Sequence, residues 1–508
     1  MPNPVIVKSL RRTAIAGAGA LALLAGFAAP ALISRPADAQ EITPGRIAAP
    51  GGAPMSFADL IERVRPAVVS ISVRQTPNSA TGPSLEGLPP GFEEFFRGRP
   101  GRPGGAAPTS LGSGFFIDER GTIVTNHHVI ANAEEITIRT SDGRDLQADI
   151  VGSDELTDIA VLRVRGSNPR FQFVTFDDSN HLRVGDWVVA VGNPFGLDGT
   201  ATAGIVSALG RRDAGSTAYV DYVQIDAPIN RGNSGGPTFD LNGNVIGVNS
   251  AIFSPTGGSV GIGFAIPATT ASQVVAQLER GGRVTRGWIG VSIQPLDSDI
   301  ARSLGLEEAR GALIANVVAD GPAARAGLQQ GDVILSLDGH RIEDSRDLTQ
   351  RVGATEVGRN ARVEILRNGQ RRTLNIRLQE RPSEQQLLAS VAPNAQNAPP
   401  PPQEPGVAGV SASGLGVTVR PLSAEDRTRL SLTANQAGLI ITAIAPESDA
   451  SGKLGVGEVI LQADGRAVRT AQELETATGA AQRATRPVLL QVEGRAGRRF
   501  VAVDVAAE

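Results

Sequence analysis

The sequence predicts a mainly β protein, in which a large β domain is followed by two copies of a smaller module that mixes strands and helices. Residues 111–267 contain many short apolar segments separated by turn residues, and no long helical period appears before about residue 270. Beyond residue 285, one residue pattern occurs twice at a constant spacing. A chain of 508 residues is also too long for a single hydrophobic core, and its length predicts about three domains.

Composition excludes several classes of function. The 48 basic and 52 acidic residues give a net charge of −4, so the chain has no basic field suited to nucleic acid. The absence of cysteine excludes disulfides, thiolate zinc sites and cysteine nucleophiles. His181 and His340 are distant from the adjacent pair His127 and His128, which argues against a histidine metal site. We therefore expect no metal and no other cofactor.

The first 39 residues have the pattern of a signal peptide. Lys8, Arg11 and Arg12 form a basic start, an apolar run follows from Thr13 to Ile33, and Ala37-Asp38-Ala39 offers small residues where a signal peptidase reads. An uncleaved membrane anchor is the alternative, but the proline inside the apolar run and the Ala-x-Ala site favour cleavage. The mature protein is then expected to work outside the cytoplasm, exported by the general or the twin-arginine route.

The segment before the main β pattern predicts a helix, a strand and a long loop. Residues Ser56 to Val64 read as a short helix, with Ser56 as its cap and Pro66 as its stop. The apolar run VVSISV at 68–73 predicts a strand. Residues 75–110 are rich in Pro and Gly and predict a mobile loop, which is either a disordered insertion or a contact arm between subunits.

Hairpins and one helix are predicted in the β domain, which we place at residues 55–283. The stretches GSGFFIDERGTIVTN and EITIRTSDGRDLQADIV each read as a hairpin, and Asn242-Gly243 is a strong signal for a third. Residues 158–164 and 187–192 read as further strands. Thr270 can cap a helix that Gly281-Gly282 ends.

The two modules are recognised as an internal repeat. IGV at 289–291 matches LGV at 415–417, and GDVILSLDG matches GEVILQADG, both at an offset of 126 residues. The first copy spans 285–380 and the second 411–508. Between them, residues 381–410 form a Pro-rich linker that should be extended and only partly flexible.

The stretch INRGNSGGP at 229–237 is the strongest candidate for chemistry. A nucleophilic serine needs a tight, exposed turn with backbone N–H groups converging beside it, and the glycines around Ser234 supply that turn. A base and an orienting carboxylate must complete the site, and TNHHV and LTDIAVL lie upstream. From the residues alone, either of the paired histidines can be the base, and Asp154 competes with Asp158 as the carboxylate.

TNHHV, TDIAVL and GNSGGP, together with VGNPFG and GIGFAIP, resemble the chymotrypsin-like serine proteases of the HtrA, or Do-like, family. The resemblance covers residues 55–508, and the repeated modules resemble the PDZ domains of its periplasmic DegP-type branch. It implies a double β-barrel protease followed by two PDZ domains. The implied function is an ATP-independent endoprotease that degrades misfolded or unfolded exported proteins in periplasmic quality control, with chaperone activity beside it.

The resemblance also assigns the site residues. The family's base directly precedes the valine, which makes it His128, and the carboxylate directly precedes the IAVL strand, which makes it Asp158, with Ser234 as the nucleophile. The oxyanion hole is then formed by the backbone N–H groups of Gly232 and Ser234, with Asn233 positioning the turn. The specificity pocket is expected to be lined by Ile229, Asn249, Ser250, Ala251 and Ile252. Pro228 stands where trypsin-like relatives have an aspartate, so a small aliphatic residue is expected before the scissile bond.

In PDZ domains a loop around a glycine captures a chain-terminal carboxylate, and the adjacent strand edge pairs with the peptide. The loops are Trp288, Ile289, Gly290 and Val291 in the first copy, and Leu415, Gly416 and Val417 in the second. The glycines are also compatible with a plain tight turn. The second copy has Glu458 at the position of Asp332, so its peptide binding is an open question, and oligomer assembly is its alternative role.

The family resemblance further implies partners and regulation. Expected partners are unfolded polypeptides, peptides with hydrophobic C-termini and other copies of the chain, as trimers formed around Phe57 or as larger cages; peripheral membrane association is compatible with this picture. Arg211 or Arg212 is the expected sensor in an activation loop at Leu209–Ser216, and Asn249–Gly258 is a second such loop. A chaperone or scaffold that binds without cleaving is the competing function, and the complete set of base, carboxylate and nucleophile argues against it.

Overall fold

A computed structural model of the chain describes residues 56–75, 109–166, 170–177, 181–193, 199–212, 217–230, 232–252, 254, 259–383, 386–387, 409–430, 432, 436–494 and 497–505. The predicted signal peptide, almost all of the predicted mobile loop and most of the predicted linker lie outside these residues. The chain from Ser56 to Glu508 is one compact unit. In the part of the chain that the structure describes, no helix has both the length and the apolar character needed to cross a membrane.

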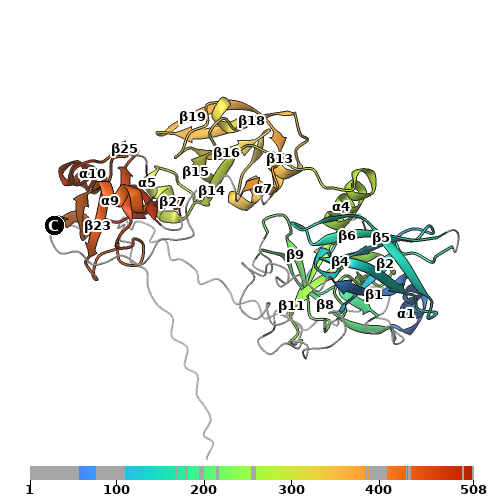
Figure 1. Cartoon of the computed structure of the whole chain (residues 1–508). Coiled ribbons are helices and arrows are strands. Elements are labelled where there is room, and N and C mark those ends of the chain that lie inside the picture. Colours follow the sequence, from blue (N-terminus) through green and yellow to red (C-terminus); the bar gives the residue numbers. More distant parts are fainter. Residues whose placement is uncertain are drawn as a thin grey trace, which may run out of the picture. The chain divides into compact units, whose positions relative to one another are not determined.

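The first half of the β domain is a closed barrel of six strands in the order β1-β2-β3-β6-β5-β4 (Figure 1). Its strands are β1 (Val68–Gln75), β2 (Thr109–Phe116), β3 (Thr122–Thr125), β4 (Ala133–Arg139), β5 (Asp145–Asp154) and β6 (Ile159–Val164). The predicted hairpins β2–β3 and β4–β5 are confirmed by antiparallel pairing. Alternate side chains of these strands fill the barrel, and Ile71, Ile123, Ile138 and Leu162 are fully buried there.

The second half is another closed barrel, in the order β10-β11-β12-β9-β8-β7. Its strands are β7 (Trp187–Gly192), β8 (Thr200–Arg211), β9 (Tyr222–Ile225), β10 (Pro237–Phe239), β11 (Val245–Ile252) and β12 (Gly263–Pro267). The predicted turn at Asn242-Gly243 joins β10 to β11, and Gly243 adopts a φ of 91° that suits glycine. Helix α4 (Ala268–Gly281) follows β12 and buries Val274 and Leu278 in a core shared with both barrels.

Two predicted helix starts are wrong. Helix α1 (Ala58–Val64) begins after Phe57, and Ser56 only accepts a bond from the backbone N–H of Ala58, so it is not the N-cap. Helix α4 begins directly after Pro267 rather than at Thr270, because β12 runs straight into it. Its end is as predicted: Gly282 adopts a left-handed φ of 70° and its N–H donates to Leu278 O.

The first module is a small sheet with helices. Its elements are β13 (Gly287–Trp288), β14 (Val291–Pro295), α5 (Ser298–Ser303), β15 (Ala312–Val317), α6 (Pro322–Arg325), β16 (Val333–Leu337), β17 (His340–Arg341), α7 (Ser345–Ala354), β18 (Asn360–Arg367), β19 (Gln370–Arg377) and β20 (Gln379–Glu380). The sheet order is β14-β15-β16-β18-β19, so β14 is an edge strand.

The second module repeats the sheet of the first with an added strand, and its described residues form no helix at the position of α6. Its elements are β21 (Val410–Ala412), η3 (Ser413–Leu415), β22 (Val417–Pro421), α9 (Ala424–Arg429), β23 (Leu439–Ile444), β24 (Val459–Ala463), β25 (Arg466–Ala467), α10 (Ala471–Arg483), β26 (Val488–Gly494) and β27 (Gly497–Val503). The order β21-β22-β23-β24-β26-β27 places an extra strand, β21, outside β22. Helix α10 begins after Thr470, which forms a capping box with Glu473.

Candidate active site

Ser234 lies in a tight turn whose backbone is fixed on several sides. The Asn233 N–H donates to Asn230 O at 3.0 Å, and the Gly235 N–H donates to Asn249 O at 2.8 Å. Gly232 and Gly235 have φ values of 96° and 82°, which a residue with a side chain adopts only with strain. The turn therefore requires its glycines, as the sequence predicted.

Ser113 on β2 ties this turn to the first barrel. Its backbone N–H donates to Ser234 O at 2.8 Å, and its hydroxyl donates to Gly232 O at 2.5 Å. The same hydroxyl accepts from the Asn193 N–H at 2.8 Å, and Ser113 itself is fully buried. No sequence signal had marked Ser113, because its partners lie about a hundred residues further along the chain.

His128 and Asp158 meet at the edge of the first barrel. His128 lies in the one-turn helix α3 (His127–Ile130), which directly follows β3, and Asp158 directly precedes β6. The His128 Nδ1 atom is 2.9 and 2.8 Å from the two carboxylate oxygens of Asp158, and the His128 backbone N–H also donates to that carboxylate at 3.0 Å. Both side chains are about one-fifth exposed, at 19% and 20%.

Asp158 is held by further groups that favour its ionised form. The Ser250 hydroxyl donates to its second oxygen at 2.8 Å, and the Asn126 side chain donates to its backbone carbonyl at 2.9 Å. Burial alone would raise the pKa of Asp158, but the charge of His128 and the hydrogen bonds from His128 and Ser250 lower that pKa overall. Asp158 also has a φ of 56°, a strained value that its surroundings must enforce.

Tyr222 borders the same network. Burial and the charge of Asp158 raise the pKa of the Tyr222 hydroxyl above its ordinary value, and the hydrogen bond with Ser250 offsets this only in part.

The neighbouring His127 points elsewhere. Its Nδ1 lies 3.1 Å from the Ser153 hydroxyl, while its backbone N–H donates to Asp158 O. The two histidines lie in a helical turn, where successive side chains are about 100° apart, so they point in different directions. Asp154, the rival carboxylate, instead binds Thr157 and Arg286. Of the two candidate bases and the two candidate carboxylates, only the side chains of His128 and Asp158 are hydrogen-bonded to each other.

The predicted specificity residues divide into two groups. Ile229 and Ile252 are fully buried in the core of the second barrel, and Ala251 is nearly so. Asn249 turns toward β10, where its side chain accepts from the Thr238 hydroxyl at 2.5 Å. Ser250 was expected to line the pocket, but its hydroxyl is bound to Asp158.

In the part of the chain that the structure describes, no cluster of three metal-ligating side chains occurs.

The two candidate sensor arginines have different surroundings. Arg211 donates to the Gln224 side chain at 2.8 Å. Arg212 forms an ion pair with Asp344, the N-cap of α7 in the first module. Arg346 on the same helix binds Asp221 at 3.0 Å and Arg212 O at 3.1 Å. Of these two arginines, only Arg212 contacts the first module among the described residues.

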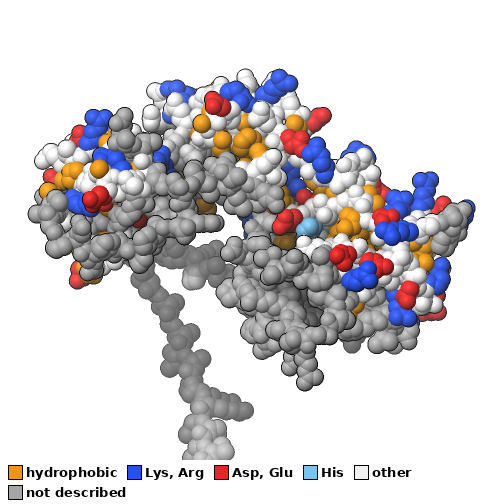
Figure 2. Space-filling model, viewed as in Figure 1, with side chains coloured by type: hydrophobic (Ala, Val, Ile, Leu, Met, Phe, Trp, Pro, Cys, Tyr) orange, Lys and Arg blue, Asp and Glu red, His pale blue; other side chains and the backbone are white. Residues whose placement is uncertain are grey.

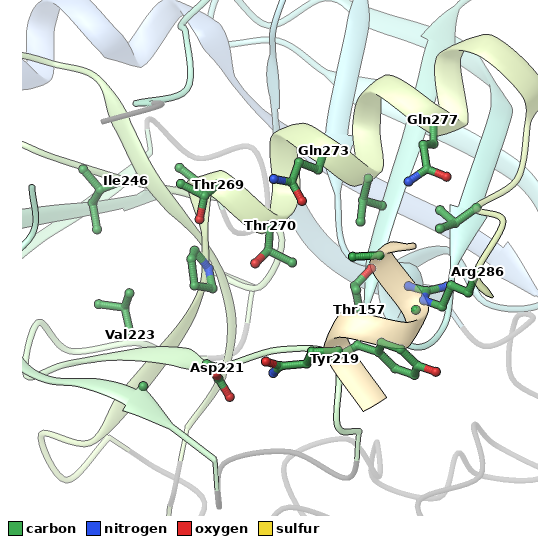
Figure 3. Close-up of a pocket in the computed structure, with 18 of the residues that line it drawn as sticks. Thr157, Tyr219, Asp221, Val223, Ile246, Thr269, Thr270, Gln273, Gln277 and Arg286 are labelled. Carbon is green, nitrogen blue, oxygen red and sulfur yellow. The ribbon is translucent and has the colours of Figure 1, made fainter. Parts of the chain in front are cut away.

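A pocket of about 600 Å³ lies beside this contact, lined by both the protease domain and the first module (Figure 3). Figure 3 shows Arg286, Tyr219 and Thr157 close together at one end of it. The Arg286 guanidinium lies 4.6 Å from the centre of the Tyr219 ring and binds both carboxylate oxygens of Asp154 at 2.7 Å. Thr157, the residue before Asp158, donates to the same carboxylate.

The candidate carboxylate loops of the two modules share a left-handed glycine but differ before it, because Trp288 ends the strand β13 whereas Leu415 ends the 3-10 turn η3. Gly290 and Gly416 have left-handed φ values of 78° and 67°. Gly290 O accepts from the Val318 N–H at 2.9 Å, and Gly416 O accepts from the Ala445 N–H at 2.7 Å.

On the visible face of the molecule, basic and acidic side chains are interspersed rather than gathered by sign (Figure 2).

Two closed six-stranded barrels, with a His–Asp pair on one and a serine in a glycine turn on the other, define a chymotrypsin-like serine peptidase. A trypsin-like peptidase domain model matches residues 112–248, and a PDZ domain model matches residues 287–378.

Curated relatives extend the match over nearly the whole chain. A protein of Brucella melitensis biotype 1 named probable periplasmic serine endoprotease DegP-like is 41% identical, over 97% of this chain and 98% of the relative. A relative of the same name from Rhizobium meliloti (strain 1021) is 42% identical, over 98% of this chain and 99% of the relative. The chain belongs to this DegP-like, HtrA-type family of serine endoproteases.

Solved structures agree with this assignment. The HtrA-type protease AlgW with decapeptide is 40% identical with a TM-score of 0.55, over 65% of this chain and 99% of that chain. AlgW with tripeptide is 39% identical with a TM-score of 0.56, over 65% and 99%. The predicted fold class, the family and the serine endopeptidase activity are confirmed.

Proposed function

We propose that Ser234 is the nucleophile, His128 the general base and Asp158 the orienting carboxylate of this endoprotease. The observation that carries the proposal is the paired contact of His128 Nδ1 with both oxygens of Asp158. With Nδ1–H donating there, Nε2 is the basic nitrogen, which takes the proton from Ser234 as it attacks the peptide carbonyl. His128 then gives that proton to the leaving amine, and water hydrolyses the acyl-enzyme by the same route.

We propose that the backbone N–H groups of Gly232 and Ser234 form the oxyanion hole. The Asn233 N–H already donates within the turn, which leaves the two flanking N–H groups for the substrate oxygen. The bond from the Ser113 hydroxyl fixes Gly232 O, and so fixes the tilt of this turn. We propose from the family that the side-chain pocket lies beside the backbone at Ile229 and at 249–252 and takes a small aliphatic residue before the scissile bond. The Ile229 and Ile252 side chains are fully buried and support these two segments from the barrel core.

The substrates are proposed to be unfolded or misfolded proteins of the periplasm. The relatives are named periplasmic endoproteases, and the apparent signal peptide fits export to that compartment. The chain carries no nucleotide-binding motif, which supports cleavage without ATP. Binding of unfolded chains without cleavage would give the same protein a chaperone activity.

We propose that the first module captures peptides with free hydrophobic C-termini. Its loop turns at Gly290 with a left-handed φ of 78°, and β14 beside it is a sheet edge to which a peptide can add. Assembly as trimers, or as larger cages on substrate, is proposed from the family. Phe57, the predicted trimer contact, packs against the half-exposed Trp187 at 5.6 Å between ring centres.

The test of the catalytic assignment is the Ser234→Ala variant. It should lose on the order of 10⁶ in kcat on casein or a short chromogenic peptide, with unchanged thermal unfolding. Parent protein should label with a fluorophosphonate probe and the variant should not. If purified Ser234→Ala protein cleaved casein at a comparable rate, the nucleophile assignment would be wrong.

A further inference from the structure

In the second module, the sheet edge at which a PDZ domain binds a peptide is already paired with another strand. Strand β22 follows the loop around Gly416, as β14 follows the loop around Gly290 in the first module. One side of β22 pairs with β23, and the other pairs with β21 in antiparallel register, Val410 opposite Val419 and Ala412 opposite Val417. In the first module, the free side of β14 has no partner strand among the described residues.

Strand β21 also contacts the helix that would face a bound peptide. Ala412 is only 1% exposed and belongs to the same core cluster as Leu474 and Ala481 of α10. At the other end of the strand, Val410 is 53% exposed. The segment therefore lies between β22 and α10 with its C-terminal end buried, which is how a captured peptide runs in β-strand addition.

Strand β21 fills the groove of the second module, and the loop beside that groove is retained. Its loop keeps the left-handed glycine and the backbone bond that the first loop has. A module that had lost its binding function by drift would have no reason to keep the loop and also supply a strand to the groove.

We infer that residues 409–412 are the ligand of the second module's groove, so that this module does not capture free chain ends. Only Ser413 and Gly414 separate the strand from the loop, so the strand's effective concentration at the groove is on the order of millimolar or higher. A free peptide must displace it before binding. Peptide capture then falls to the first module alone, and the inference rests on the capture proposed for that module.

The stoichiometry of peptide binding tests the inference directly. Full-length Ser234→Ala protein, which cannot cleave the probe, is titrated with a fluorescein-labelled decapeptide that ends in Val-Val with a free carboxylate. We expect saturation at one peptide per chain, with no second site at a tenfold higher peptide concentration. Gly290→Val, which places a side chain against the Trp288 ring, should abolish binding. Two peptides per chain, or binding that survives Gly290→Val, would overturn the inference.

Variants in β21 test whether the strand is what closes the groove. Ala412→Glu places a charge in the buried end of β21 and should raise the ratio to two peptides per chain. Val410→Glu changes an exposed residue of the same strand, and it should leave the ratio at one. Amide hydrogen exchange of residues 410–412 reports whether the strand is docked, and these amides should be protected in the parent with and without peptide.

The remaining outcomes are decided by hydrogen exchange. If hydrogen exchange shows that Ala412→Glu releases β21 and the protein still binds one peptide per chain, β21 is not what closes the groove and the inference fails. If the parent binds no peptide, the proposed capture by the first module fails; protected amides in β21 would still support a filled groove, and rapid exchange there would refute it.

Discussion

Arg286 should be the residue of the first module on which Asp158, the proposed orienting carboxylate, most depends. Its guanidinium binds Asp154 through both terminal nitrogens at 2.7 Å, and both side chains are only 9% exposed. Asp154 in turn accepts from the backbone N–H and the hydroxyl of Thr157, directly before Asp158. The strained φ of Asp158 is thus maintained by a turn that Arg286 holds from outside the barrel.

The size of the effect follows from the burial of this pair. Removing one partner of a buried ion pair leaves an uncompensated charge and costs about 3–5 kcal/mol, whereas an exposed pair is worth about 0–1 kcal/mol. Arg286→Ala should therefore lower the unfolding midpoint of the protease domain by roughly 6–20 °C. Because a displaced catalytic group can cost about a hundredfold in rate, kcat/KM should fall about ten- to a hundredfold. Arg286→Lys keeps the charge without the two-point contact and should recover part of the loss.

A matched control lies three residues upstream. Arg283 also pairs with a carboxylate, Glu380, but the two side chains are 67% and 42% exposed. Arg283→Ala should therefore leave both the unfolding midpoint and kcat/KM nearly unchanged.

The measurements are calorimetry and steady-state hydrolysis of a short chromogenic peptide. The double variant Asp154→Ala/Arg286→Ala should lose about 1–3 kcal/mol less than the sum of the single variants, because no charge is left buried alone. If Arg286→Ala matched Arg283→Ala in both the unfolding midpoint and kcat/KM, the proposed support of Asp158 would be refuted.

Four further predictions concern the site and its regulation. His128→Ala should abolish hydrolysis while His127→Ala keeps most of it, and the reverse result would move the base one residue upstream. The folded pKa of Asp158 lies below its ordinary value of 3.8, so the stability from its ionised form is present above about pH 4 and is lost as the pH falls through the folded pKa. Asp158→Asn should therefore be less stable than the parent at pH 7 in urea unfolding, with a gap that narrows below about pH 4; a constant gap would contradict the assignment. Ser113→Ala leaves a buried carbonyl and a buried amide without their partner, at about 1–3 kcal/mol each, and should lower kcat more than it raises KM, while an unchanged kcat would remove Ser113 from the support of the nucleophile turn. A peptide with a free hydrophobic C-terminus should activate chromogenic hydrolysis several-fold, about 1–2 kcal/mol of coupling, and its amidated twin should not; equal activation by both would exclude carboxylate capture as the input.

Local patterns predicted most of the fold. Alternating apolar residues marked the strands of both barrels, and turn residues such as Asn242-Gly243 marked the hairpins, because these signals act within a few residues. Helix starts were less predictable. Ser56 and Thr270 have the right chemistry for a cap, but the chain enters each helix from a packed neighbour that sets the first turn.

The site was predictable only in part for a similar reason. The turn around Ser234 has a local signature, whereas the supports of the site come from distant strands. Ser113 and Ser250 are ordinary serines in strand patterns, and their roles arise only when the barrels bring them beside Gly232 and Asp158. Choosing between the paired histidines required the family resemblance, because the backbone of α3 is not encoded by any short-range pattern.

We attribute the expected difference in peptide binding between the two modules to strand β21 rather than to the replacement of Asp332 by Glu458. Glu458 replaces Asp332, yet it accepts from the Gly455 N–H as Asp332 accepts from the Gln329 N–H. Each carboxylate also binds an arginine. Asp332 binds Arg367 on β18, which pairs with β16, whereas the longer glutamate reaches Arg499 on β27, one strand beyond β26. Since the acid, the left-handed glycine and the helix α10 are all retained, the substitution does not explain a loss of peptide binding. The separate function of the second module must come from what fills its groove, and β21 is the element that does so.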